Sequence, residues 1–240
     1  MNRVAPAAPR RARGTEFLDD PGVDSTIAIR SLADIRRSNR LFGGTRAILD
    51  ALDHAFDRAM PAHAVGANGV TLLDVGTGAG DIPAAARARA ARHGVRLHTV
   101  GLERTVPVAR AAAPSCGPAV VGDAQLLPFA SGAFDVVTCS QVLHHFAGAD
   151  AERVLRELHR VARHLVIVGD LRRSWIAAAG IWLASWPLAF HPVSRHDGVV
   201  SVMRGYSAAE LSALVEGATG VAPHVRRRAG FRIVAAWSPR

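Results

Sequence analysis

Short apolar runs alternate along most of the chain with amphipathic segments. The runs are rich in Val, Leu and Ile and end near a glycine or an acidic residue, which is typical of buried strands that lead into helices. They cover residues 71–75, 97–102, 119–122, 131–140 and 165–169. The segments that predict helices cover 81–93, 105–113 and 150–163. This alternation predicts an α/β fold with a parallel sheet.

The N-terminal part of the chain has a different pattern. Residues 1–25 are rich in Ala, Pro and Arg, and we expect them to form a disordered tail. Two N-terminal helices are expected within 26–60. A capping box at Ser31 and Asp34 opens the first of them, and Thr45 is the predicted N-cap of the second.

The alternation stops after the run 165–169. Residues 171–206 form an insertion at the carboxyl end of that strand, where ligands bind in open α/β sheets. A second capping box, at Ser207 and Glu210, then predicts a helix. Two final strands are expected near 222–228 and 231–237, with a turn between them.

Three alternate glycines, Gly76, Gly78 and Gly80, follow the first apolar run directly. Without Cβ atoms they let a ligand approach the backbone, and the N–H groups at the start of the next helix point at it. A glycine turn of this kind serves several nucleotide cofactors, and some turns of this type only reverse the chain.

Two carboxylates distinguish these alternatives. Glu103 follows the second strand, where it can accept both hydroxyls of a ribose, and Asp123 follows the third. His144 and His145 come after the fourth strand. A dehydrogenase would show Gly-x-Gly-x-x-Gly and would need no acid at Asp123.

Together these motifs, over about residues 70 to 170, resemble the class I S-adenosylmethionine-dependent methyltransferases. The resemblance implies a Rossmann-like seven-stranded sheet, with six parallel strands and one antiparallel strand, in a single domain over 26–240. It places the methionine moiety of the cofactor on Gly76 and Gly78, the ribose on Glu103, and the adenine on Asp123 and Ala124. The remaining residues expected around the cofactor are Asp74, Thr77, Gly80, Asp81, Arg104, Ser140 and His145.

The insertion is expected to choose the acceptor. It carries Trp175, Trp182, Trp186, Phe190 and Tyr206, which favour an apolar or aromatic acceptor. The runs 39–44, 170–173, 191–198 and 201–206 also resemble a bacterial methyltransferase subgroup of polyketide and phenolic-lipid pathways. That resemblance implies a phenolic or polyketide-derived acceptor and a role in secondary metabolism.

Methylation of a phenol needs a group that removes the hydroxyl proton or stabilises the phenolate. An unperturbed phenol has a pKa of about 10 and an imidazole one of about 6.5, so a histidine base requires help from hydrogen bonds or positive charge. The candidate bases are His144, His145, His191 and His196, and the candidate cations are Arg172, Arg173 and Arg195. We favour His196, in the Arg-His-Asp triplet, with His145 and Arg173 as further catalytic candidates, and we expect no metal.

Charge and cysteine content limit the partners. The 29 basic residues exceed the 20 acidic ones, for a net charge of +9, which can attract nucleic acid. The arginines near the N-terminus and at 226–228 need not form one groove, so no specific nucleic-acid partner is expected. Cys116 and Cys139 are too few for a disulfide framework, and a cytoplasmic protein is expected. The apolar run 175–190 is shorter than the roughly 20 residues that span a bilayer.

The sequence therefore predicts a methyltransferase that uses S-adenosylmethionine on a small hydrophobic, phenolic or polyketide-derived acceptor, with O-methylation favoured. The alternatives are C-methylation of an activated ring or quinone, an RNA or protein methyltransferase, and a non-catalytic cofactor-binding protein. No Asn-Pro-Pro-Tyr motif follows the fourth strand, where amino-methylating nucleic-acid enzymes carry one. The identity of the acceptor and the oligomeric state stay open.

Overall fold

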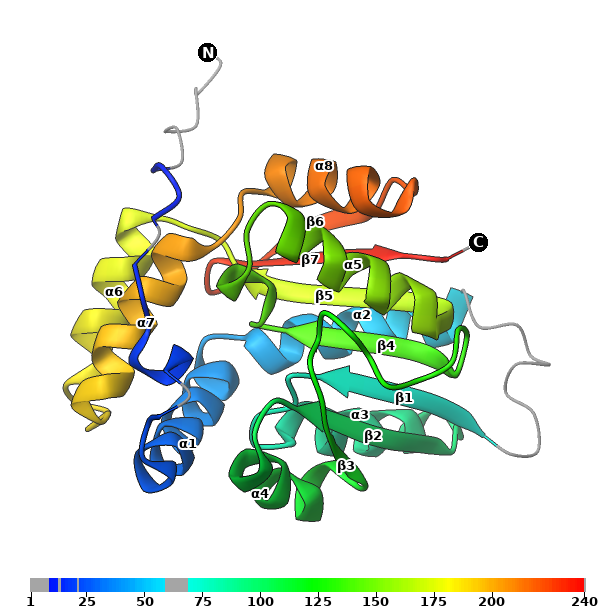
Figure 1. Cartoon of the computed structure of the whole chain (residues 1–240), viewed down its shortest axis with the longest axis horizontal. Coiled ribbons are helices and arrows are strands. Elements are labelled where there is room, and N and C mark those ends of the chain that lie inside the picture. The colour runs from blue at the N-terminus through cyan, green and yellow to red at the C-terminus, as the bar shows by residue number, and fades with distance from the viewer. Residues whose placement is uncertain (1–8, 13, 21, 59–68, 240) are drawn as a thin grey trace.

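The central element of the fold is one seven-stranded sheet with the strand order β3-β2-β1-β4-β5-β7-β6 (Figure 1). The computed structural model describes residues 9–12, 14–20, 22–58 and 69–239. The strands are β1 Val70–Val75, β2 Leu97–Glu103, β3 Ala119–Val121, β4 Phe134–Ser140, β5 Ala162–Leu171, β6 His224–Arg228 and β7 Arg232–Trp237. Strand β7 is antiparallel to both of its neighbours, and the other pairs are parallel. The predicted sheet of six parallel strands and one antiparallel strand is confirmed.

Both faces of the sheet are covered by helices, because successive side chains of a strand point to opposite faces. Leu72 and Ile167 pack with α2 (Gly44–Arg58) and α3 (Asp81–Arg92) on one face. Their chain neighbours Leu73 and Val168 pack with α5 (Ala149–Val161) and α8 (Ala208–Thr219) on the other. Figure 1 shows these two helix layers on either side of the sheet. Helix α4 (Val106–Cys116) packs beside β2 and β3.

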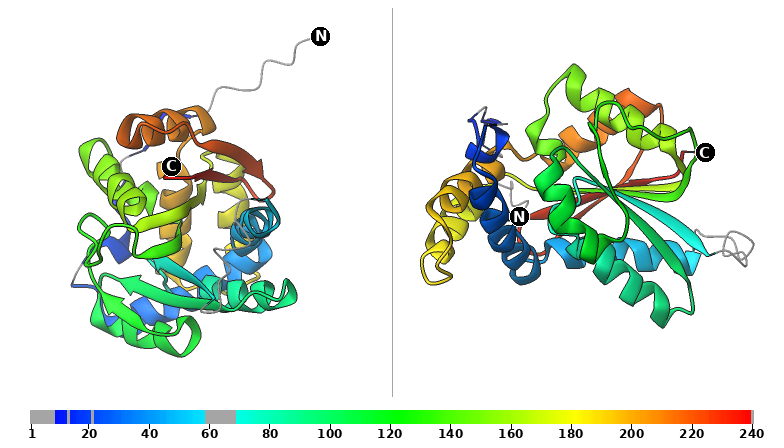
Figure 2. Two further views of the ribbon diagram at one scale, coloured as in Figure 1. Left: turned by 90° about the vertical axis from the view of Figure 1, so that its right-hand side faces the viewer. Right: turned by 60° about the horizontal axis from the view of Figure 1, so that its bottom comes forward.

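The insertion after β5 forms a helical pair over the carboxyl ends of the strands. Helix α6 (Trp175–Ser185) packs against α7 (Pro192–Arg204), which in turn contacts α1 (Ser25–Leu41). These three helices stand together at one end of the sheet in the right-hand view of Figure 2. Within the described ranges, no helix is long and apolar enough to cross a bilayer.

The starts of the two N-terminal helices differ from the prediction. Helix α1 begins at Ser25, because the Asp24 carboxylate accepts the backbone N–H groups of Thr26 and Ile27 at 2.8 and 3.2 Å. The capping box predicted at Ser31 and Asp34 is therefore wrong, since both residues are buried inside this helix. Thr45, the predicted N-cap of the second helix, lies one residue inside α2, where its hydroxyl donates to Asp81 at 3.1 Å.

Residues 9–12, 14–20 and 22–25 do not form the disordered tail that composition predicted. Ala12 N–H donates to the Met203 carbonyl at 3.0 Å, and the short 3₁₀ helix η1 (Phe17–Asp19) is anchored on α7. Its anchor is the Asp197 carboxylate, which accepts the N–H groups of Phe17 and Leu18 at 2.9 and 3.1 Å. Amino-acid composition does not reveal these contacts, because the partner residues lie far away in the sequence. Residues 1–8, 13 and 21 of the predicted tail lie outside the described residues.

Candidate active site

The larger of two adjoining cavities lies at the carboxyl ends of β1, β2 and β4 and has a volume of about 550 Å³. Ligand pockets commonly measure about 300–1,000 Å³. The N-terminal segment and α1 also contribute to its wall. Most of the predicted cofactor residues line it, namely Gly76, Thr77, Gly78, Asp81, Glu103, Arg104, Asp123, Ala124, Ser140 and His145.

The glycine turn after β1 needs glycine for two separate reasons. Gly76 has φ +70°, and a Cβ there would lie 2.3 Å from Cγ2 of Val142, so a side chain would clash inside the cavity wall. Gly80 lies outside the cavity lining. A Cβ on Gly80 would lie 2.9 Å from backbone atoms of α4, so this glycine lets α3 start close to α4. The two glycines thus shape the turn from its inner and outer sides.

Glu103 ties β2 to the glycine turn. Its Oε1 accepts the Gly78 N–H at 2.6 Å, and its Oε2 accepts the Arg104 N–H at 3.1 Å. Burial raises the pKa of Glu103, and these two hydrogen bonds oppose the shift because they favour the carboxylate. The carboxylate is thereby held at the cavity wall, where a ribose could bind.

Asp123 and Asp74 occupy different positions relative to the cavity. Asp123 lines it and accepts the Gln125 N–H at 2.9 Å. Asp74 lies beneath the wall, buried in β1, and accepts the hydroxyl of Thr138 at 2.7 Å. Its burial raises its pKa to about 7. The structure therefore does not place Asp74 against a ligand in this cavity.

A second cavity, of about 370 Å³, adjoins the first. The two share Glu16, Leu18, Ile35, Gln141 and His145. The other apolar side chains of its wall are Phe42, Leu171, Ile176, Ala177, Ile181, Phe190, Val202 and Phe231. It lies between α1 and the α6–α7 pair, as expected for an acceptor pocket formed by the insertion.

The tryptophans of the insertion are not part of this wall. Trp175, Trp182 and Trp186 are 67%, 48% and 56% exposed, and none of them lines the second cavity. Phe190 does line it. Tyr206 is buried elsewhere, with its hydroxyl donating to the Phe146 carbonyl at 2.7 Å, and burial raises its pKa to about 12. The apolar character of the cavity therefore comes from aliphatic and phenylalanine side chains instead of tryptophan.

Two of the predicted catalytic residues lie outside both cavities. The His196 side chain is 47% exposed, its Nδ1 is 2.9 Å from Asp197, and its ring packs edge-on against Phe17. Arg173 is buried, donates to the Gly205 carbonyl at 3.0 Å and forms an ion pair with Glu210. This pairing lowers the pKa of Glu210 to about 2. The predicted base His196 therefore packs against η1, and the predicted cation Arg173 pairs with α8, each away from both cavities.

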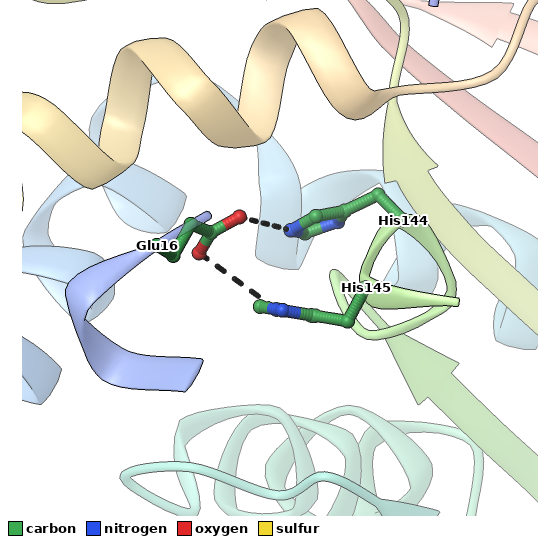
Figure 3. Close-up of side chains that lie close together, drawn as sticks. All are labelled: Glu16, His144 and His145. Atoms are coloured by element: carbon green, nitrogen blue, oxygen red, sulfur yellow. Dashed lines mark ion pairs between the residues drawn. The ribbon is translucent and has the colours of Figure 1, made fainter. Parts of the chain in front are cut away.

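The third predicted catalytic residue, His145, lines both cavities, as Glu16 does, and His144 lines the second. Figure 3 shows the two imidazoles, which come from the 3₁₀ helix η2 (Leu143–His145), facing the Glu16 carboxylate. His144 Nε2 is 3.5 Å from Glu16 Oε1, and His145 Nε2 is 3.9 Å from Glu16 Oε2. We call Glu16, His144 and His145 the histidine–glutamate cluster.

Each imidazole of the cluster is held by a further carboxylate. His144 Nδ1 is 2.7 Å from Asp170, and His145 Nδ1 is 2.7 Å from Asp19. Burial alone would lower the pKa of His144, but the adjacent carboxylates of Asp170 and Glu16 raise it to about 9. In the absence of other cations, His144 is therefore protonated at neutral pH.

Arg204 connects this cluster to α7. Its guanidinium donates to the carbonyls of His144 and His145 at 3.2 and 2.9 Å and contacts Glu16 at 3.3 Å. It also donates to Asp19 at 2.5 Å. Sequence reasoning gave no role to Glu16, Asp19 or Arg204. Arg204 lies in the run 201–206 that carries the subgroup resemblance, whereas the composition around Glu16 gives no signal of a site.

Residues 73–167 match the family model of the methyltransferase domain. The chain contains a class I methyltransferase domain. Methyltransferases of this family and fold use S-adenosylmethionine as methyl donor, so it is the cofactor of this enzyme. The predicted residues of the larger cavity fit that cofactor, because an apolar-walled space with a carboxylate on one side and bare backbone on the other suits a nucleoside with a charged tail.

Solved structures support the fold. The methyltransferase is similar to an S-adenosylmethionine-dependent methyltransferase of Thermotoga maritima, at 16% identity over 90% of this chain and 100% of that chain (TM-score 0.57). A Nostoc punctiforme protein proposed to be an O-methyltransferase is 15% identical over 95% of this chain and 64% of that chain (TM-score 0.60). The CMeT domain of the citrinin polyketide synthase is 10% identical over 70% and 46% of the two chains (TM-score 0.53). Curated protein sequences give no match.

Proposed function

We propose that this methyltransferase O-methylates a small hydrophobic acceptor of phenolic or polyketide-derived type. The observation that carries the proposal is the junction of the two cavities at the histidine–glutamate cluster. An acceptor in the second cavity would present its polar group to imidazoles and a carboxylate, while the rest of it contacts Ile181, Phe190 and Val202. An apolar wall with a few convergent polar groups is the usual composition of a small-molecule site.

The proposed reaction requires the acceptor oxygen to attack the methyl group of the sulfonium cofactor in line. The cofactor supplies the activated methyl group, so the protein has to align the oxygen and favour loss of its proton. Among the described residues, His145 and Glu16 are the titratable groups that line both cavities, and Asp19 orients the His145 ring. We assign to His145, with His144 behind it, the contact with the acceptor hydroxyl that we first expected of His196.

A macromolecular acceptor is less compatible with this site. The second cavity is bordered by α1, α6 and α7, and Leu18 and Glu16 from the N-terminal segment lie between it and the larger cavity. A base or a peptide side chain would have to enter past these elements. C-methylation of a phenolic ring uses the same pocket, because ionisation of the hydroxyl also makes the ring carbons nucleophilic.

The proposal is tested by measuring methyl transfer from labelled S-adenosylmethionine to phenols, resorcinols, quinones and RNA. Ile181→Trp should fill the second cavity and raise the acceptor KM without changing the Kd of the cofactor. Leu183→Trp is the matched control, since Leu183 is on the same helix, 61% exposed and outside the cavity wall. Methyl transfer to RNA alone, or equal effects of both variants, would contradict the proposal. The site of methylation on the product decides between oxygen and carbon.

A further inference from the structure

The three side chains of the histidine–glutamate cluster bring their ligand atoms within 4.8 Å of one another (Figure 3). Nitrogen and oxygen ligands lie about 2.0–2.2 Å from a bound Zn²⁺, which places two ligands of a tetrahedral site roughly 3.4 Å apart. His144 Nε2 lies 3.5 Å from Glu16 Oε1 and His145 Nε2 lies 3.9 Å from Glu16 Oε2, and both separations are close to that spacing. We propose that Glu16, His144 and His145 bind a divalent transition-metal ion.

The outer contacts of both imidazoles match those of metal-binding histidines. Such a histidine donates its other ring N–H to a carboxylate or carbonyl, which fixes the tautomer and turns the free nitrogen towards the metal. Here Asp170 accepts from His144 Nδ1 and Asp19 accepts from His145 Nδ1, each at 2.7 Å. Asp170 is itself fixed by the backbone N–H groups of His144 and Leu171 at 2.9 and 2.7 Å. Both Nε2 atoms therefore face Glu16 with their ring orientations set.

Nε2 of His144 is buried and makes no hydrogen bond of normal geometry among the described residues, and Glu16 Oε1 lies 3.5 Å from it. Buried polar atoms are almost always bonded, and an ion between His144 Nε2 and Glu16 would complete the contacts of this nitrogen. In the part of the chain that the structure describes, the carboxylates of Glu16 and Asp19 form ion pairs with one guanidinium, that of Arg204, and Asp170 pairs with His144.

The place of the cluster gives the ion a function. Three protein ligands with an open position are the arrangement of catalytic metal sites, whereas structural sites use four protein ligands. Glu16 and His145 line both cavities, so an open position between them would face the acceptor. Resting on the proposed function, we infer that the acceptor oxygen binds the ion and loses its proton to water more readily there. A phenol or catechol is the acceptor class that this arrangement favours.

The ligand set indicates which ions to use as probes. Two imidazoles and one carboxylate bind Zn²⁺, Co²⁺ and Fe²⁺ in preference to Mg²⁺ or Ca²⁺, which require mostly oxygen ligands. Co²⁺ gives visible absorption whose intensity depends on coordination geometry, so binding is observed without measuring activity. Zn²⁺, which has no such absorption, then serves as the competitor.

The experiment titrates untagged, metal-free full-length enzyme with Co²⁺ and follows the visible spectrum. We expect one ion per chain, displaced by Zn²⁺. Asp19→Asn should weaken binding about 10- to 100-fold, as for other outer contacts of metal ligands, and His145→Ala and Glu16→Gln should weaken it at least as much. His196→Ala is the matched control, because His196 also has its Nδ1 beside an aspartate but belongs to no group of three potential ligands among the described residues. Cofactor affinity and circular dichroism show whether each variant is folded.

Absence of Co²⁺ and Zn²⁺ binding by the wild type would overturn the inference, as would equal binding by the wild type and folded His145→Ala. The two proposals fail separately. If methyl transfer to phenols resists EDTA and the protein binds neither ion, the metal site is rejected and the proposed function stands. One bound Co²⁺ without methyl transfer to any phenol leaves the metal site and rejects the acceptor class.

Discussion

The Glu103 carboxylate accepts the backbone N–H of Gly78 at 2.6 Å, so the end of β2 is tied directly to the glycine turn after β1. This bond fixes an acidic side chain and a bare backbone segment on adjacent parts of one cavity wall. The Glu103 side chain is half-buried, and this burial raises its pKa. A ribose hydroxyl that donates to it would stabilise the charged form.

We therefore expect Glu103→Ala to weaken S-adenosylmethionine binding by about 10- to 100-fold, which corresponds to the roughly 1.5–3 kcal/mol of a hydrogen bond to a charged group. Isothermal titration calorimetry measures the change. Glu157→Ala is the control, since Glu157 also accepts a backbone N–H, that of Leu127, but lies outside the cavity. An unchanged Kd in Glu103→Ala would remove this residue from the cofactor site.

Gly76 and Gly94 allow the effect of a clash to be separated from that of backbone strain. Both have φ +70°, but a Cβ on Gly76 would lie 2.3 Å from Val142, whereas nothing lies within 4 Å of one on Gly94. Alanine in this left-handed region costs about 1–2 kcal/mol by itself. We expect Gly94→Ala to lose that amount in urea unfolding, and Gly76→Ala to lose more and to bind the cofactor poorly. Similar losses in both variants would show that the turn rearranges around the clash.

The parts of the site that sequence could predict are local. The glycine turn, Glu103 and Asp123 each follow a strand directly, and the carboxyl ends of parallel strands meet at one edge, so their positions follow from the strand pattern. Glu16 and Asp19 could not be found in this way. Their partners, His144, His145 and Arg204, are well over a hundred residues away, and only tertiary packing brings them together.

The position of His196 outside both cavities has a different cause. The Arg-His-Asp triplet lies within helix α7, where neighbouring side chains point about 100° apart. Asp197 is buried beneath η1, and His196 is consequently turned towards solvent. His196 Nδ1 still meets Asp197 at 2.9 Å, but the His196 ring lines neither cavity. The sequence favoured this segment as the source of the base because it does not show that the three side chains belong to a helix.

His196→Ala should accordingly have near-normal turnover and cofactor affinity. Asp197→Ala should lower the free energy of unfolding by on the order of 2 kcal/mol, because the N–H groups of Phe17 and Leu18 lose their buried acceptor. Steady-state kinetics and urea unfolding of the two variants, side by side, test this division of roles. A large loss of turnover in His196→Ala, partly restored by raising the pH, would return this histidine to the role of base.

The last prediction concerns the pH dependence of stability and depends on Asp74. Burial raises its pKa from 3.8 to about 7, so the folded state binds this proton more tightly than the unfolded state does. The stabilisation from protonated Asp74 is therefore fully present below about pH 4 and is lost as the pH rises to about 7. Above about pH 7, Asp74 is ionised in both the folded and the unfolded state, and its contribution to the free energy of unfolding changes no further. At about 1.4 kcal/mol per pKa unit the loss is at most about 4 kcal/mol.

Asp74→Asn removes the titration and keeps an oxygen for the Thr138 hydroxyl, so its unfolding free energy should fall less than that of the wild type between pH 5 and pH 8. Asp150→Asn, at an exposed site on α5, should follow the wild type. Urea unfolding at the two pH values measures the difference, and parallel pH dependence in the wild type and Asp74→Asn would show that Asp74 is already ionised in the folded protein at pH 5.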